Sequence, residues 1–174
     1  MKAFITSCCI WLAGLCLAAV GLEAFLTGNL KKSLSFADGE IAIWEDILNG
    51  RMNAETLIYG SSRAWVHFNP ALLEEAYGGG VYNLGIDGYR FEMQYFRHLQ
   101  VLKHNPRPQR IILALDVFTL EKRKDLFNRR QFLPYARIPD FREWTSRYKG
   151  FTFWDTRLPA LRYSNEQAAK RTAG

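Results

Sequence analysis

Two short segments of the sequence bring serine hydroxyls and glycine amides to places where they could perform acyl transfer. The first is Gly60-Ser61-Ser62, and the second runs from Asn83 to Gly88. A serine at a glycine turn can attack an acyl carbonyl. Backbone amides in a first helical turn can stabilise the resulting oxyanion, because they have no partner inside the helix. The first segment is therefore either an exposed nucleophile or a serine that only caps a helix, and the second is either an oxyanion site or an ordinary loop in which Asp87 caps the next helix.

Three apolar runs, residues 55–59, 81–84 and 110–115, are short enough to be strands and alternate with helical patterns. Helices are expected from residue 40 to the Asn49-Gly50 stop, over 70–76, and over 91–104. Connections between strands that are long enough to contain a helix imply parallel strands, so the predicted fold is an α/β three-layer sandwich. After Arg110, the run 110–115 is apolar, and it is expected to be covered on both faces. Ligands of such sheets bind beyond the carboxyl ends of the strands, where both segments fall.

The amino-terminal end carries the clearest physical signal in the chain. From Ala3 to Leu22 there are 20 residues without a charge, and a helix of that length rises about 30 Å, enough to cross a bilayer. The run is longer than the apolar part of a signal peptide, which favours an uncleaved single-pass anchor over residues 1–28. A tether over 29–39 and a folded domain over 40–174 would follow. Lysines flank the run on both sides, so loop charge leaves the orientation open.

Composition limits the remaining possibilities. The chain has 174 residues, of which 48% are hydrophobic and 23% charged, so we expect one packed domain rather than a disordered chain. Its three cysteines, Cys8, Cys9 and Cys16, all lie in the apolar run, which leaves no thiol for a zinc site in the domain. No cofactor is expected.

Residues 121–174 hold 13 Lys or Arg against 6 Asp or Glu, interleaved with aromatic residues. One interpretation is an excursion whose aromatic side chains pack on parts of the domain that this sequence lacks. The other is a surface that binds an anionic cell-envelope polymer. A membrane anchor argues against nucleic acid as the partner.

Taken together, the two segments resemble the SGNH, or GDSL-like, hydrolase and acyltransferase superfamily over about residues 56–120. The resemblance makes Ser62 the nucleophile, places Asn83 at the start of the second block, and lets the amide of Gly88 join the oxyanion hole. Ser61 stands where the superfamily usually has aspartate, which is similar to the membrane-tethered branch of D-alanine transfer proteins and to the related alginate O-acetyltransferases. The resemblance implies a flavodoxin-like sheet, an extracytoplasmic domain, a cell-envelope glycan as substrate, and a multi-pass membrane acyltransferase as a partner.

The sequence also departs from the superfamily. The third strand runs into Asp116 where an asparagine is usual, so one oxyanion donor is missing, and Asp116 would orient a neighbour or cap a loop. The closing Asp-x-x-His block is absent, because no histidine follows His104, and neither His67 nor His98 is placed to replace it. Without a base the serine should be a poor nucleophile.

Two hypotheses remain. The chain is the front portion of an anchored serine esterase or O-acyltransferase, an account favoured by an ending, 165–174, without a strand pattern. Alternatively it is an inactive, anchored binding or scaffold protein that presents its basic aromatic third to an anionic glycan or a membrane partner.

Overall fold

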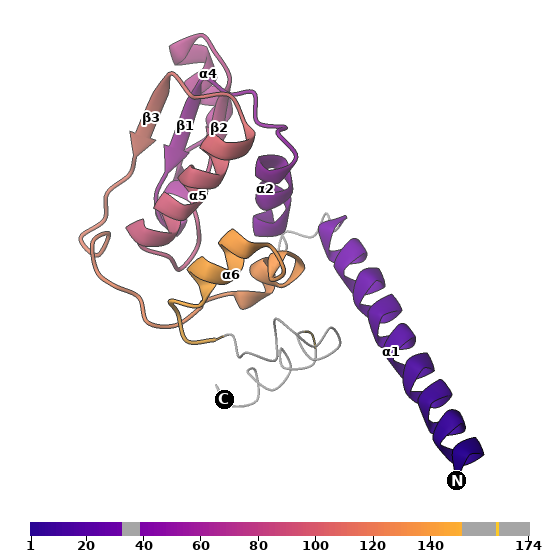
Figure 1. Ribbon diagram of the computed structural model, residues 1–174. Coiled ribbons are helices and arrows are strands. Elements are labelled where there is room, and N and C mark those ends of the chain that lie inside the picture. The colour runs from indigo at the N-terminus through magenta and orange to yellow at the C-terminus, as the bar shows by residue number, and fades with distance from the viewer. Residues whose placement is uncertain (33–38, 151–162, 164–174) are drawn as a thin grey trace.

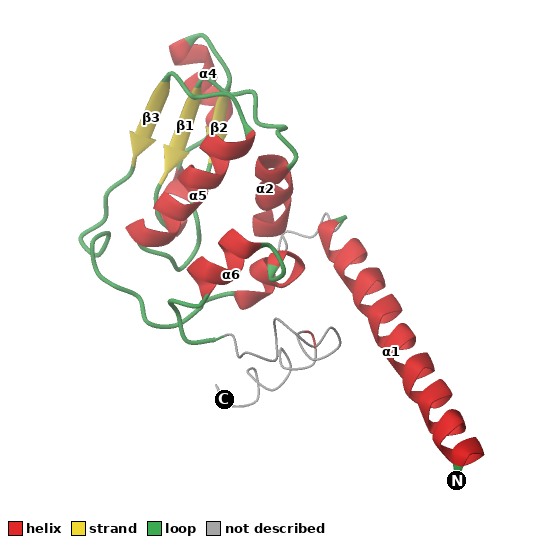
Figure 2. Ribbon diagram, viewed as in Figure 1, coloured by secondary structure: helices red, strands yellow, loops and turns green. Residues whose placement is uncertain are grey.

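The computed structural model describes residues 1–32, 39–150 and 163, and it is a mixed α/β structure (Figures 1 and 2). Residues 33–38, which make up most of the expected tether, and the aromatic residues Phe151, Phe153 and Trp154 lie outside the described part. In chain order, the elements are α1 (Lys2–Lys31), α2 (Gly39–Leu48), β1 (Thr56–Tyr59), α3 (Ser62–His67), α4 (Pro70–Tyr77), β2 (Val81–Asn83), α5 (Phe91–His104), β3 (Arg110–Leu113), the 3-10 helix η2 (Arg129–Tyr135) and α6 (Pro139–Thr145).

The three strands form a parallel sheet in the order β2-β1-β3, which confirms the predicted direction of the strands. Local signals in the sequence set the element ends. Asn69 caps α4 by accepting a hydrogen bond from the amide of Ala71, and Gly78 ends that helix with φ +70°. In register, Ile58 of β1 pairs with Asn83 of β2 and with Ile112 of β3. The carboxyl ends of all three strands therefore meet at one edge.

Helices pack on both faces of the sheet, because successive side chains of β1 point to opposite sides. Leu57 and Tyr59 belong to the larger buried cluster, which includes Trp44 of α2 and residues of α5. Ile58 belongs to a smaller cluster, with Ala64 of α3 and Val81 of β2. In Figure 1, α5 crosses in front of the strands while α4 lies behind them.

The expectation that β3 is covered on both faces is wrong. Ile111 is 53% exposed and Leu113 is 40% exposed. β3 is the edge strand, and within the described residues no further strand pairs with it. After Arg110, β3 has the apolar sequence of an interior strand, and the structure leaves it at the border of the sheet.

Four aromatic residues of the basic third pack inside the described domain. Phe132, Tyr135 and Phe141 are fully buried against Trp44, and Tyr148 is 5% exposed. These four side chains help to close the core of the described domain, with Trp144 half-buried beside them. The two interpretations of residues 121–174 as a whole stay predictions. Of the basic side chains in this part of the chain, Arg142 and Lys149 are exposed, whereas Arg129 and Arg130 are half-buried.

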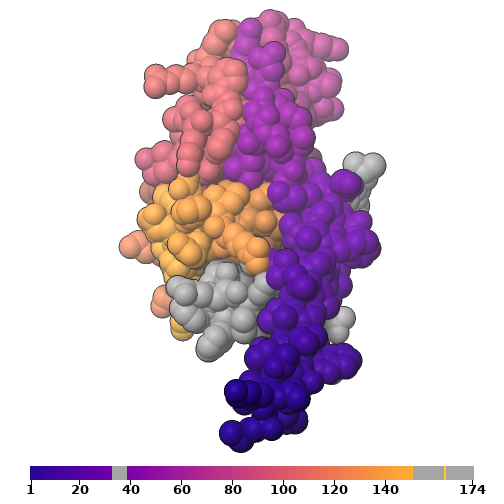
Figure 3. Space-filling model, turned by 45° about the vertical axis from the view of Figure 1, so that its right-hand side comes forward, coloured from indigo at the N-terminus to yellow at the C-terminus, as the bar shows by residue number. Residues whose placement is uncertain are grey.

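Helix α1 is long and apolar enough to cross a membrane or to serve as a signal sequence. It continues to Lys31 and so includes the first residues of the expected tether. Its last turns pack on the domain: Arg137 contacts Glu23 at 2.7 Å, and Lys31 contacts Glu45 at 3.0 Å. Figure 3 shows the amino-terminal part of α1 standing clear of the other described residues.

A buried ion pair joins α2 to α5. Arg97 is fully buried and donates to Glu40, which is 2% exposed, across 2.5 Å. Arg97 also donates to the carbonyl oxygens of Leu84 and Gly85, at 3.2 and 3.1 Å, and Glu40 accepts from the amide of Asp87 at 3.0 Å. The pair thereby fixes the loop after β2 against two helices.

Arg97→Met should lower the free energy of unfolding by about 3–5 kcal/mol, because Glu40 would keep its buried charge without a partner. The double variant with Glu40→Leu should recover much of that loss. Arg147→Met is the control: it removes exposed pairs with Glu143 and Glu92 and a cation–π contact with Trp144, and it should cost at most about 1–2 kcal/mol. Denaturant unfolding of the full chain measures all three, and equal losses for Arg97→Met and Arg147→Met would contradict the assignment.

Candidate active site

The two predicted segments lie side by side at the carboxyl edge of the sheet. The parallel pairing of β1 with β2 continues beyond the strand ends, where the amide of Leu84 donates to Ile58 at 2.7 Å and the amide of Ile86 donates to Gly60 at 3.0 Å. Gly60 is two residues before Ser62, and Ile86 is two residues before Gly88. The structure thus brings together the loops that carry both predicted site residues.

Asn83 ties these loops to α3. Its side-chain amide donates to the carbonyl oxygens of Ala64 and Phe68, at 2.9 and 3.0 Å, and its oxygen accepts from the amide of Gly85 at 2.9 Å. Gly85 lies directly against α3, where an added Cβ would stand 2.6 Å from the backbone nitrogen of Trp65. Asn83 is therefore a positioning residue, and the glycine after it permits the close approach.

Ser61 is the capping serine. Its oxygen accepts from the amide of Arg63 at 3.2 Å, and its hydroxyl donates to the carboxylate of Asp116. Ser61 is 5% exposed. Asp116 lies three residues after β3 and also contacts the guanidinium of Arg63 at 3.2 Å, so it holds two neighbouring side chains, which is one of the two roles that the sequence left open. The Ser61 hydroxyl therefore donates one hydrogen bond and accepts another within the protein.

Ser62 and Gly88 have polar groups that remain available. Ser62 is the first residue of α3 and is half-buried, and its hydroxyl makes no hydrogen bond to any described residue. Gly88 has φ +69°, a conformation that favours glycine. Its carbonyl accepts from Arg123, whereas its amide has no partner in the described part of the chain. The hydroxyl of Ser62 is a candidate nucleophile, and the amide of Gly88 is a candidate oxyanion donor.

The histidines are placed elsewhere. His67 is the exposed last residue of α3, His104 ends α5, and the Nδ1 atom of His98 shares a hydrogen bond with Tyr59 at 2.9 Å. None of the three has a contact with Ser61 or Ser62. An imidazole base for Ser62 is thus absent from the described residues.

The structure adds a group of cations that sequence reasoning missed. The guanidinium of Arg90 lies 4.1 Å from the ring centre of Phe118, and that of Arg63 lies 5.9 Å from it. Arg90 also pairs with Glu121 at 3.2 Å. The sequence could have indicated Arg63, because this residue directly follows Ser62. Arg90 could not be found in this way, because the approach of the 116–121 loop depends on the tertiary fold.

Within the described ranges, no three His, Cys, Asp or Glu side chains gather as a metal ion would require. Comparison of the chain with protein-family models, with curated proteins and with solved structures finds no match in any of the three. The chemistry of the site therefore has to be argued from its own geometry.

Gly85→Ala should destabilise the protein by about 1–3 kcal/mol, because the new methyl group would collide with the backbone of α3. Gly79→Ala is the matched control. Its Cβ would meet the carboxylate of Glu55, the end of a side chain that can move, so its cost should be smaller. Thermal unfolding of the two variants measures the difference, and an equal loss would show that the two loops are not in the contact described.

Proposed function

We propose that the chain belongs to a membrane-anchored SGNH-type serine esterase or O-acyltransferase, with Ser62 as the nucleophile and the amide of Gly88 in the oxyanion hole. One observation carries the proposal. Two loops bonded to each other at the edge of a parallel sheet hold a serine hydroxyl and a glycine amide, both without partners among the described residues. Such an edge is where parallel sheets bind ligands.

The reaction would be acyl transfer. The Ser62 oxygen attacks the acyl carbonyl and gives up its proton to water or hydroxide, and the bond to the leaving alcohol breaks as that alcohol takes up a proton from the solvent. The acyl group then passes from Ser62 to a second hydroxyl or to water. The amide of Gly88 would stabilise the negative oxygen of the tetrahedral intermediate. Arg63 would favour an anionic acceptor, such as an acidic cell-envelope glycan presented outside the membrane.

A fluorophosphonate probe tests the nucleophile in the full chain, held in lipid nanodiscs. The wild type should be labelled slowly, and its rate should rise about tenfold per pH unit above neutrality, because no described imidazole supplies a base near pH 6.5 and the alkoxide fraction follows pH. Ser62→Ala should abolish the label.

Ser61→Ala is the discriminating variant. It removes the cap and the bond to Asp116, which should lower stability by about 0.5–2 kcal/mol, and it should retain the label. Label lost in Ser61→Ala but kept in Ser62→Ala would assign the reaction to the Ser61–Asp116 pair. Label that survives both changes would remove the proposed site.

A second candidate, an anchored binding protein, is favoured by the absence of a described histidine near Ser62. Residues 121–150 carry 9 Lys or Arg against 4 Asp or Glu, and Arg142 and Lys149 among them are exposed.

If this second function holds, the full chain should bind dextran sulfate but not neutral dextran, with affinity that falls as the salt concentration rises. Arg142→Glu with Lys149→Glu should weaken binding at least tenfold, and unchanged binding would exclude this surface.

A further inference from the structure

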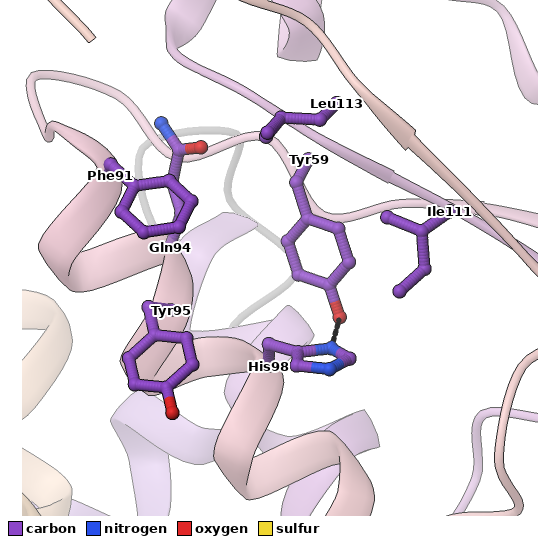
Figure 4. A pocket seen from close by; sticks show the side chains of 7 residues that line it. All are labelled: Tyr59, Phe91, Gln94, Tyr95, His98, Ile111 and Leu113. Atoms are coloured by element: carbon purple, nitrogen blue, oxygen red, sulfur yellow. Dashed lines mark hydrogen bonds between the residues drawn. The ribbon is translucent and has the colours of Figure 1, made fainter. Parts of the chain in front are cut away.

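Two cavities of the described structure differ in the polarity of their walls. The first lies between α5 and β3 and has a volume of about 160 Å³. Figure 4 shows aromatic rings and aliphatic chains around it, while Tyr59 and His98 share a hydrogen bond at 2.9 Å and the side-chain oxygen of Gln94 is inaccessible. This wall therefore presents no polar group that would select one apolar molecule over another.

The second cavity lies between the last turns of α1 and the segment of η2, and its volume is about 320 Å³. Figure 3 shows these turns of α1 against the orange part of the chain. Charged side chains line the cavity from both sides: Glu23 and Lys31 from α1, and Arg137 two residues after η2. Lys31 and Arg137 keep 35% and 57% of their side-chain surface exposed. A ligand in this cavity can therefore reach both cations.

Both cations keep hydrogen-bond donors for a ligand. Nη2 of Arg137 donates to Glu23 at 2.7 Å, whereas Nε and Nη1 make no hydrogen bond to any described residue. Lys31 contacts Glu45 at 3.0 Å, and an ammonium group has three donors. Glu23 is 5% exposed and holds Arg137 in place. The charged side chains of the wall have a net charge of +1, which suits a group with one negative charge.

The place of the cavity along α1 indicates what kind of molecule carries that charge. If residues 3–22 cross the hydrocarbon core, Lys31 lies about 13 Å beyond it along the helix axis, and the headgroup layer fills about 5–8 Å of this distance. Val20, which belongs to the apolar run and is 49% exposed, lines the cavity at its other end. The wall thus changes from apolar to cationic in the direction in which a phospholipid changes from acyl chain to phosphate.

We propose that this cavity binds an anionic phospholipid of the phosphatidylglycerol class, with its phosphate between Lys31 and Arg137 and an acyl chain along Val20. The headgroup beyond that phosphate is uncharged, whereas the quaternary ammonium of phosphatidylcholine would be repelled by two cations. Basic cavities at the membrane surface recognise anionic lipids in this way. The inference rests on the membrane anchor of the proposed function and is independent of the acyl-transfer chemistry.

Native mass spectrometry of the full chain in detergent micelles measures the binding. Dioleoyl phosphatidylglycerol and dioleoyl phosphatidylcholine are added at equal concentrations. The wild type should bind one phosphatidylglycerol at least about tenfold more tightly than phosphatidylcholine, because two cations contact its phosphate.

Gly28→Leu fills the cavity without removing a charge. Gly28 lines the cavity, and a Cβ added there meets no atom within 4 Å, so the larger side chain fits the fold. The preference for phosphatidylglycerol should fall to within about twofold. Gly21→Leu is the matched control, since Gly21 lies on the same helix with equally open space and does not line the cavity. It should keep the full preference.

Lys31→Gln removes one of the two cations and should reduce the preference about fivefold. Arg142→Gln is its control, because Arg142 is an exposed cation of α6 outside the cavity. It should leave the preference unchanged. Equal affinity of the wild type for the two lipids, an unchanged preference in Gly28→Leu or Lys31→Gln, or an equal loss in either control would overturn the inference.

Flotation with phosphatidylcholine vesicles in high salt separates this inference from the anchor on which it rests. The full chain should stay with the vesicles, because the apolar helix and not surface charge holds it there. A chain that leaves them would overturn both the anchor and this inference. A chain that stays but shows no preference between the two lipids would overturn this inference alone.

Discussion

The buried contact between Glu40 and Arg97 is the constraint on which the candidate site depends. Two full charges removed from water are tolerated only when they neutralise each other and fill their remaining hydrogen-bonding capacity. Here that capacity is directed at the loop after β2, through the carbonyls of Leu84 and Gly85 and the amide of Asp87. The geometry that stabilises the pair also fixes the loop that ends in Gly88. The same contacts therefore stabilise the fold and position the candidate site.

The two neighbouring serines at this edge of the sheet have different roles. Ser61 is fastened to Asp116 and to the amide of Arg63, and this closes the turn from β1 into α3. Because Ser61 meets the structural need, the hydroxyl of Ser62 is left at the first turn of a helix, beside amides that lack partners. A capping serine and a reactive serine were alternatives in the sequence, and the structure assigns capping to Ser61.

Local patterns were enough to predict the alternation of strands and helices and the parallel sheet, because caps, glycine stops and apolar periodicity act over a few residues. Asn83 and Gly88 could be singled out for the same reason, since Asn83 ends a recognisable strand and Gly88 lies in the loop that follows it. Burial could not be predicted at β3, because an apolar strand looks alike in sequence whether or not a neighbour covers it. The burial of Phe132 and Phe141 and the approach of Arg90 to Phe118 depend on contacts between distant segments, which no local pattern contains.

The central claim is that the oxygen of Ser62 and the amide of Gly88 act on one point in space. A crystal structure of the phosphonylated full chain measures this directly. The account predicts a phosphonyl group on Ser62 with one of its oxygens about 2.7–3.1 Å from the nitrogen of Gly88, the range expected of an oxyanion-hole donor. A phosphonyl group on Ser62 with the amide of Gly88 directed away from it would contradict the account.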